Sequence, residues 1–363
     1  MKWLVFGNFQ FTDIYMDLVF QDGLQTDVMR SQEFNGLGTF THGLHLAGQE
    51  AYEYRAIPMP LLPWAIRKRG LGLLLEMERY ESTLREGRLK RAIEEWLKWV
   101  DSRSFDAFFC RELFSFSIDQ LERIEKMFSI RTIWLSWSPG RVHSLEYKKY
   151  FSYFTHIFLI DKEGVEKLRK EGFNAYYMPL ALSDFCTNRT RYKKKYKLGF
   201  IGTIYPNRME MLTSVPEKLL NFWSSNFEKD TAVMYPELKR CFRGSVWGQK
   251  MLEKMAEVEI LINPVHRSYM LGKSDNVTNF RNFESLGEHT FQLSEFKPAI
   301  REIFDENEVA TYNCLEDLKS KIDYYLSKPK LCLEMVQRAR KKVLSEHLYS
   351  HRMKRIVEIV HSD

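Results

Sequence analysis

The chain has 363 residues, of which 44% are hydrophobic, 14% aromatic and 28% charged, and its formal net charge is +6. A chain of this length and composition exceeds one hydrophobic core, which predicts two folded domains and excludes extensive disorder. The apolar runs are too short to cross a bilayer, and the start, MKWLVFGNF, lacks the apolar region of a signal peptide. Five scattered cysteines without a C-x-x-C pair argue against a disulfide framework and a zinc site, and favour a reducing cytoplasm.

Strands and helices alternate through the first half of the chain. The patterns predict strands at 2–8, 50–57, 105–110, 131–137, 156–161 and 175–181, and helices at 83–102, 117–129 and 162–173. Strands separated by helices are typical of a parallel sheet with helices on both faces. The first half is therefore predicted to be an α/β domain.

After residue 181 the chain becomes polar and basic, which marks a predicted domain boundary. The alternation then restarts, with strands at 197–203 and 310–313, a helix at 206–215, a helix running into a strand at 251–265, and three helices at the end. The expected fold class is α/β with two doubly wound Rossmann-like domains, at 1–181 and 182–345. A C-terminal helix within 346–363 could pack back on the first domain.

The basic stretch RTRYKKKYK (189–197) could contact phosphate, nucleic acid or anionic lipid. The alternative is a solvated linker. We favour the linker because no aromatic or glycine-rich RNA-binding motif accompanies the charges. No nucleic-acid partner is expected.

Several common catalytic motifs are missing from the sequence. No G-x-G-x-x-G follows the first strand, no Asp-x-Asp pair could hold a divalent cation, and no Walker loop, G-x-S-x-G elbow or kinase signature occurs. Dehydrogenase, hydrolase and phosphotransferase functions lose their usual support. In doubly wound folds, ligands bind outside the carboxyl ends of the strands, so we look for a site there.

The stretch TNFRNFESLGEHTFQLSEF (278–296) predicts a short helix, a glycine stop and a strand. Asn276 and Thr278 could cap the helix, and Gly287 is a natural residue just beyond its end. Glu284 lies three residues after Arg281, so the two side chains are neighbours. Such a carboxylate could bind both ribose hydroxyls while the arginine and the N-terminal amides hold a diphosphate. An exposed ion pair is the alternative, and the stretch alone does not decide.

A glycine turn follows the predicted strand 197–203. Gly202 would let backbone amides approach an anion, and Arg208 would add charge. A tight turn beside a surface arginine is an equal alternative.

Residues 156–357 resemble the CgeB-like (spore maturation protein) glycosyltransferases, which have the GT-B architecture of two Rossmann-like domains facing a cleft. The matching blocks occur in order and include KLGFIGTIYPNRMEML, ILINPVHRS, NFRNFESLGEHTFQLSEF and SEHLYSHRMKRI. The first 150 residues match poorly, as expected if they bind the acceptor.

The resemblance implies a donor site in the second domain. Glu284 would bind the donor ribose, and Arg281 with the amides near Asn276 and Thr278 would bind the diphosphate. Gly202 and Arg208 would lie under the phosphates, and Asn263 and His266 would line the sugar side. Asn276 stands eight residues before Glu284, where a large related retaining family has glutamate, so the anomeric outcome stays open.

The implied reaction is transfer of a sugar, of hexosyltransferase type, from a nucleotide-sugar donor to a hydroxyl of a glycan, a lipid-linked acceptor or a protein. No metal and no cofactor are expected. If the enzyme inverts, a base from the first domain is needed, and His42 and Asp13 are the candidates, each with a structural role as the stronger alternative.

Two other classes stay open. One is a non-catalytic module that binds nucleotides or nucleotide sugars, and the other is a basic protein that docks on nucleic acid or an anionic membrane. The expected location is the cytoplasm, with peripheral contact to the inner face of the membrane as an option.

Overall fold

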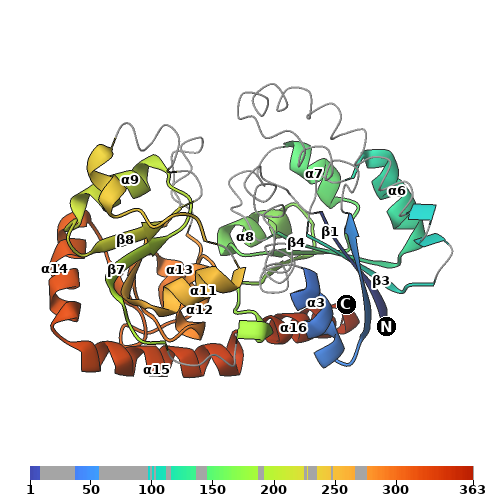
Figure 1. The fold of residues 1–363 in the computed structure, drawn as a ribbon. Helices are drawn as coiled ribbons and strands as arrows, with labels where there is room; N and C mark the ends of the chain where they lie inside the picture. The colour runs from blue at the N-terminus through green and yellow to red at the C-terminus, as the bar shows by residue number, and fades with distance from the viewer. Residues whose placement is uncertain are drawn as a thin grey trace, which may run out of the picture. The chain divides into compact units, whose positions relative to one another are not determined.

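The computed structural model describes residues 1–8, 37–56, 97–98, 100–101, 104–111, 116–135, 145–186, 192–224, 227, 235–246, 248–265 and 276–362. The chain forms two compact units (Figure 1). It passes from unit 1 to unit 2 between Met178 and Pro179, and returns to unit 1 between Arg352 and Met353. The predicted boundaries were residues 181 and 345. Most of the predicted helix 83–102 lies outside the described residues.

Unit 1 contains a six-stranded parallel sheet in the order β2-β1-β3-β4-β5-β6. The strands are β1 (Lys2–Asn8), β2 (Glu50–Ala56), β3 (Ala107–Cys110), β4 (Ile130–Leu135), β5 (His156–Leu159) and β6 (Ala175–Tyr177). Each of them was predicted, β2 from its alternating pattern. All residues of β3 and β5 are buried, as are Trp3 to Val5 of β1 and Thr132 to Leu135 of β4, as expected for parallel strands covered on both faces.

The described helices of unit 1 begin and end at recognisable signals. They are α3 (Leu37–Leu46), α6 (Ile118–Met127), α7 (Leu145–Phe151) and α8 (Lys162–Lys170). Ser117 and Gln120 form a capping box at the start of α6. Asp161 caps α8, and Gly172 follows that helix with a φ of 88°, the left-handed conformation that glycine favours.

Unit 2 contains a five-stranded parallel sheet in the order β11-β10-β9-β7-β8. The strands are β7 (Tyr196–Ile201), β8 (Leu220–Trp223), β9 (Val258–Asn263), β10 (Phe291–Glu295) and β11 (Ala310–Tyr312). The sequence patterns did not predict β8, which has only four residues. Since the chain runs from β7 to β8 on one side and then to β9 on the other, the strand order reverses at β7. Ligand sites of doubly wound folds lie at the carboxyl end of such a reversal.

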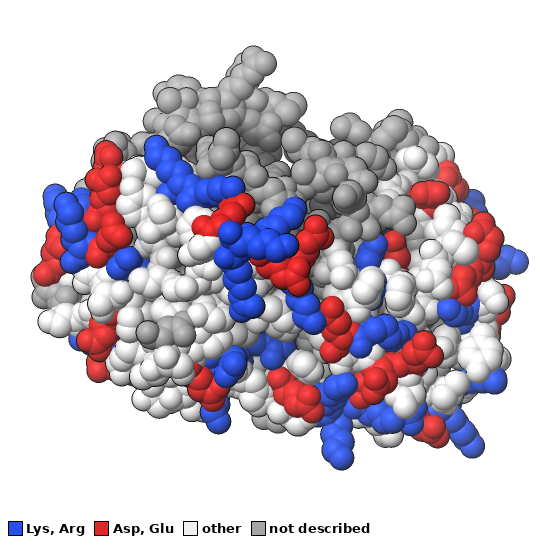
Figure 2. Space-filling view, turned by 180° about the vertical axis from the view of Figure 1, so that it is seen from behind, with Lys and Arg blue, Asp and Glu red and all other residues white. Residues whose placement is uncertain are grey.

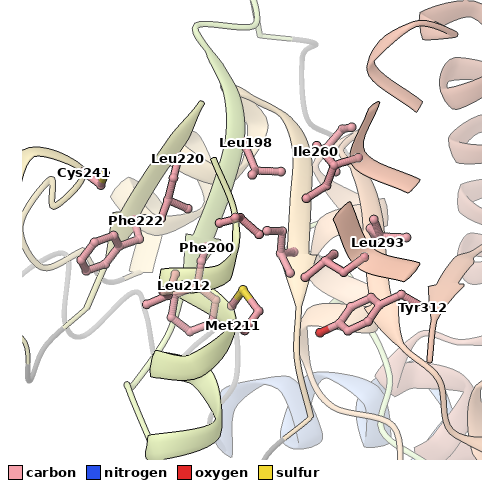
Figure 3. Packing of buried hydrophobic residues seen from close by; sticks show 14 of the residues in the cluster. Leu198, Phe200, Met211, Leu212, Leu220, Phe222, Cys241, Ile260, Leu293 and Tyr312 are labelled. Carbon is pink, nitrogen blue, oxygen red and sulfur yellow. The ribbon is translucent and has the colours of Figure 1, made fainter. Parts of the chain in front are cut away.

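Helices pack against this sheet. The helices of unit 2 are α9 (Pro206–Ser214), α11 (Gly248–Ala256), α12 (Arg281–Gly287), α13 (Pro298–Arg301), α14 (Leu315–Leu326) and α15 (Pro329–Glu346). The last helix, α16 (Tyr349–Ser362), begins in unit 2 and continues into unit 1. Figure 3 shows one face, where Leu198, Phe200, Ile260 and Leu293 pack with Met211 of α9. The helices α11 and α12 contact β9. No helix within the described ranges combines the length and apolar character needed to cross a membrane.

The helix α12 differs from its prediction. Gly287 is its last residue rather than a left-handed residue beyond it, and the positive φ of 54° belongs to His289. Gly287 is needed for close packing instead, because a Cβ there would lie 2.9 Å from Cδ1 of Leu182. The helix is also buried, with exposed fractions of 4% for Glu284 and 2% for the following Glu288. The charged residues therefore do not form a solvated stripe.

Lysines of the basic stretch contact groups of unit 2. Lys195 pairs with Glu257, and Lys197 with Glu259. The ammonium group of Lys194 donates to the carbonyl oxygen of Ala256 at 2.9 Å. On the molecular face in Figure 2, basic and acidic described side chains likewise lie beside one another. These three lysines are therefore bonded to groups of unit 2, and Lys197 belongs to β7 rather than to a linker.

The two segments where the chain changes unit are joined to each other within unit 2. Leu182 and Leu348 form a parallel bridge, and the guanidinium of Arg352 donates to the carbonyl oxygens of Pro179 and Leu180 and to Nδ1 of His347. Burial lowers the pKa of His347 to about 3, and the cations of Arg352, Lys342 and His351 act in the same direction. His347 is therefore neutral at neutral pH.

Replacing Gly287 with valine is expected to lower the free energy of unfolding by about 1–3 kcal/mol, because the new side chain overlaps Leu182. The variant Leu182→Ala creates space at the same place, so the double variant should be less destabilised than the sum of the two single variants. Urea unfolding of the four proteins measures this. Strictly additive losses would contradict the packing role of Gly287.

The neutral state of His347 predicts a pH dependence of stability. The unfolded chain takes up a proton near pH 6.5, whereas folded His347 takes it up only near pH 3, so stability falls as pH falls between these values. We expect this group to contribute a loss of at most about 1.4 kcal/mol per pH unit in that window.

The matched variant is His347→Gln, whose amide oxygen can still accept from Arg352 but does not titrate. Urea unfolding between pH 7 and pH 5 should show a steeper loss for the wild-type protein. Equal slopes in the two proteins would exclude this role for His347.

Candidate functional site

A pocket of about 240 Å³ lies in unit 2 at the carboxyl ends of β7 and β8. It is lined by Ile201, Gly202, Thr203, Arg208, Trp223, Ser224, Val246, Met251, Asn279, Phe280 and Arg281. These residues come from the ends of two strands, from α9 and α11, and from the start of α12. Its charged lining residues within the described chain are two arginines, so the pocket favours an anion.

The guanidinium of Arg281 is held from three directions. Its Nε donates to the carbonyl oxygen of Ile201 at 3.2 Å, and its Nη2 donates to Sδ of Met251 at 3.1 Å. Its Nη1 forms an ion pair with the carboxylate of Glu284, one turn further along α12. The cation is therefore fixed at the wall of the pocket before any ligand arrives.

Arg208 lies in the first turn of α9, also against the pocket. Its Nη1 donates to the carbonyl oxygen of Thr203 at 2.7 Å, and its guanidinium carbon lies 5.1 Å from the ring centre of Tyr205. Its Nε is buried and has no hydrogen-bond partner among the residues that the structure describes. A buried donor without a partner is costly, which makes this atom a candidate contact for a ligand oxygen.

The electrostatics of the pocket also favour an anion. Burial lowers the pKa of Arg208 to about 10, and the positive charge of Arg281 lowers it further, while Tyr205 acts in the opposite direction. Arg208 is still charged at neutral pH. An anion bound between the two guanidinium groups would offset both the repulsion and the loss of solvent.

Gly202 contributes space rather than a hydrogen bond. Its own N–H donates to the carbonyl oxygen of Trp223 at 3.1 Å, so it is not directed at a ligand. A Cβ at this position would lie 3.5 Å from Nη1 of Arg208. The glycine therefore leaves the arginine accessible from the turn, and this differs from the amide contact that the sequence suggested.

The structure places the other predicted donor residues around the pocket rather than in its lining. Asn276 accepts a hydrogen bond from the N–H of Ala299, and Thr278 is buried with 4% exposure. Asn263 is 3% exposed and forms a reciprocal amide pair with Asn279. In this segment the pocket is lined by residues 279–281, which come slightly later in the sequence than the predicted contacts at 276–278.

Two of the predicted residues lie outside the described chain, namely His266 and the candidate base Asp13. The other candidate base, His42, lies on α3 of unit 1. Nothing in the described residues tests a catalytic role for it. The described residues hold no group of three or more metal-binding side chains that could bind an ion.

Sequence reasoning missed several lining residues. Trp223 is the last residue of β8, the strand that was not predicted, and Ser224 follows it. Met251 has the pattern of an ordinary core residue of an amphipathic helix. No local pattern marks a methionine sulfur as a hydrogen-bond acceptor, since its partner Arg281 lies 30 positions away. The Asn279–Asn263 pair is equally non-local.

Comparison with known proteins supports the fold. Residues 208–358 match a family model described as glycosyl transferase-like, which covers the pocket arginines. Sequence comparison with curated proteins finds no match.

Three solved structures illustrate the similarity. Sucrose-phosphate synthase from Thermosynechococcus elongatus has a TM-score of 0.63 at 8% identity, covering 100% of this chain and 99% of that one. HepE of Anabaena in complex with UDP has a TM-score of 0.57 at 9% identity, covering 100% of both chains. A TarM mutant from S. aureus, in complex with Fondaparinux, alpha-GlcNAc-glycerol and UDP, has a TM-score of 0.55 at 10% identity; 75% of this chain is covered, and this chain spans 59% of the length of TarM. The expected α/β fold class is thus confirmed: the chain has the GT-B fold, and residues 208–358 are glycosyl transferase-like.

Proposed function

We propose that the protein is a glycosyltransferase that moves a sugar from a nucleotide-sugar donor to an acceptor hydroxyl. The observation that carries this proposal is the pocket at the carboxyl ends of β7 and β8, whose two arginines, Arg208 and Arg281, belong to the segment that resembles glycosyl transferases. The solved complexes of HepE with UDP and with UDP-glucose support a nucleotide sugar as the class of donor.

The two arginines would bind the donor diphosphate. Negative charge accumulates on the diphosphate as the bond to the sugar breaks, and fixed cations nearby stabilise that charge without having to reorient. Arg281 is already fixed by Ile201, Met251 and Glu284, and Arg208 offers a buried Nε that lacks a partner within the described part of the chain. We propose that these cations supply the charge that a divalent metal supplies elsewhere, so that transfer needs no metal.

Glu284 has two roles in this proposal. In the free protein its carboxylate pairs with Arg281 and is almost fully buried. A carboxylate has several acceptor sites, so in this proposal Glu284 keeps its pair with Arg281 and also accepts hydrogen bonds from the ribose hydroxyls. The diphosphate would have Asn276, Thr278 and Gly202 around it, and the sugar side would be lined by Asn263 and His266.

The acceptor side belongs to unit 1 in this proposal. The acceptor is a hydroxyl of a glycan, a lipid-linked molecule or a protein, and His42 or Asp13 would remove its proton if the reaction inverts the anomeric centre. The CgeB-like subfamily, the hexose and the cytoplasmic location, with or without peripheral membrane contact, are parts of the same proposal.

A non-catalytic nucleotide-sugar-binding protein is the second candidate, because the same pocket would serve it. Release of UDP from UDP-glucose in the presence of EDTA separates the two candidates. The third class, a basic protein docking on nucleic acid or membrane, is disfavoured by the pairing of Lys195 and Lys197 with glutamates.

The first prediction of this function concerns donor binding. In a thermal-shift panel of UDP-, GDP-, dTDP- and CMP-sugars, at least one donor should raise the Tm of the wild-type protein. Arg208→Gln and Arg281→Gln should each weaken that donor by about tenfold or more, since each removes a charged hydrogen-bond donor.

The exposed Arg338, which lies on α15 away from the pocket lining, provides the matched control. Arg338→Gln should bind the donor as the wild-type protein does. If all three variants bind equally well, the pocket is not the donor site.

A second prediction separates the two roles of Glu284. In Glu284→Gln, the affinity for UDP should fall by about tenfold relative to the affinity for inorganic pyrophosphate, because only UDP carries a ribose. Isothermal titration with both ligands measures the ratio. If both affinities change by the same factor, Glu284 pairs with Arg281 but does not bind the ribose.

A further inference from the structure

Two asparagines form a reciprocal cap around Arg281. The N–H of Asn279 donates to Oδ1 of Asn282 at 2.9 Å, and the N–H of Asn282 donates to Oδ1 of Asn279 at 3.2 Å. This is the pattern of a capping box, with asparagine at both positions. Arg281 lies between the two residues in the sequence, so its backbone is enclosed by the cap.

The same asparagines connect the cap to the sheet. Nδ2 of Asn279 donates to Oδ1 of Asn263 at 2.9 Å, at the end of β9. Nδ2 of Asn282 donates to Oε1 of Gln292 and to Oγ of Ser294, both at 3.2 Å, on β10. The cap is therefore bonded to two adjacent strands.

The network is closed and buried. Nε2 of Gln292 donates to the carbonyl oxygen of Asn282 at 3.0 Å, and Nδ2 of Asn263 donates to Oγ of Ser294 at 3.1 Å. Asn282, Gln292 and Ser294 are 1%, 2% and 0% exposed. Because buried polar networks are costly unless each group is satisfied, such a network favours one arrangement of its members.

Apolar side chains could fill the same place without this cost, and Phe283 and Leu286 of the same helix are buried apolar residues. The network also fixes the orientation of the helix, because hydrogen bonds depend on angle. It ties the backbone on both sides of Arg281 to β9 and β10, while the side chain of Arg281 bonds to the end of β7.

We infer that Asn279 and Asn282 are positioning residues that set the place of Arg281 for an anion in the pocket. This deepens the proposed function and rests on it, since the anion is the donor diphosphate. The two asparagines act through Arg281 and through the sheet, and Asn279 also forms part of the pocket wall.

The test uses Asn282→Ala in the full-length protein, with inorganic pyrophosphate as the probe and isothermal titration well below the Tm. We expect about tenfold weaker binding, because Arg281 loses its fixed position. In the Arg281→Gln background the same substitution should change the affinity by less than about twofold, since two residues that act through one contact are not additive.

The matched control is Thr290→Val, at the other end of β10, which removes a buried hydrogen bond of 2.8 Å to Met255. It should lower the Tm but leave pyrophosphate binding within about twofold of wild type. If Asn282→Ala does not fold, the milder Ser294→Ala, which removes one acceptor of the network, takes its place with an expected loss of about threefold.

The outcomes are distinct. The positioning role alone is overturned if the folded network variant binds pyrophosphate as well as the wild-type protein does. It is also overturned if the substitution causes the same loss of affinity in the wild-type and Arg281→Gln backgrounds. Absence of pyrophosphate binding by the wild-type protein overturns the proposed function, and the inference with it.

Discussion

The pocket of unit 2 depends on one constraint, which is that two positively charged guanidinium groups, both partly or largely buried, line the same small pocket. Like charges repel, and burial removes the water that would screen them. The local structure compensates with oxygen and sulfur acceptors from several elements, among them Ile201 at the end of β7, Met251 on α11 and Thr203 in the glycine turn. The carboxylate of Glu284, paired with Arg281, and that of Glu295, near Arg208, supply opposite charge.

This constraint explains why α12 is short and largely buried. The helix has to bring Arg281 to the carboxyl ends of the strands, and it has room for Glu284 one turn later. Close packing of Gly287 against Leu182 links its last residue to the segment where the chain enters unit 2. The asparagine cap links its start to β9 and β10. Both ends of the helix are therefore fixed, which suits an element that presents a charge.

Much of the fold could be predicted from local patterns. Buried parallel strands are continuous apolar runs, so β1, β5 and β7 could be recognised one by one. The start of α6 at Ser117 and the end of α8 near Gly172 follow from capping chemistry that acts over three or four residues. The four-residue strand β8 was missed because so short an apolar run has no measurable period. The pocket wall formed by Trp223 was missed with it.

The sequence by itself determined the order of the strands and helices, the α/β class, and the presence of Gly202, Arg208, Arg281 and Glu284 near the ends of strands. Only the tertiary structure decided which of these groups meet. Arg281 bonds to a carbonyl 80 positions away, and Lys195 pairs with a glutamate 62 positions away. Local periodicity reports on neighbours within one or two turns, whereas these contacts depend on how the strands are ordered in the sheet. That order buries the carboxylate of the Arg281–Glu284 pair, whose exposure the sequence left open, and it pairs lysines of the basic stretch with groups of unit 2.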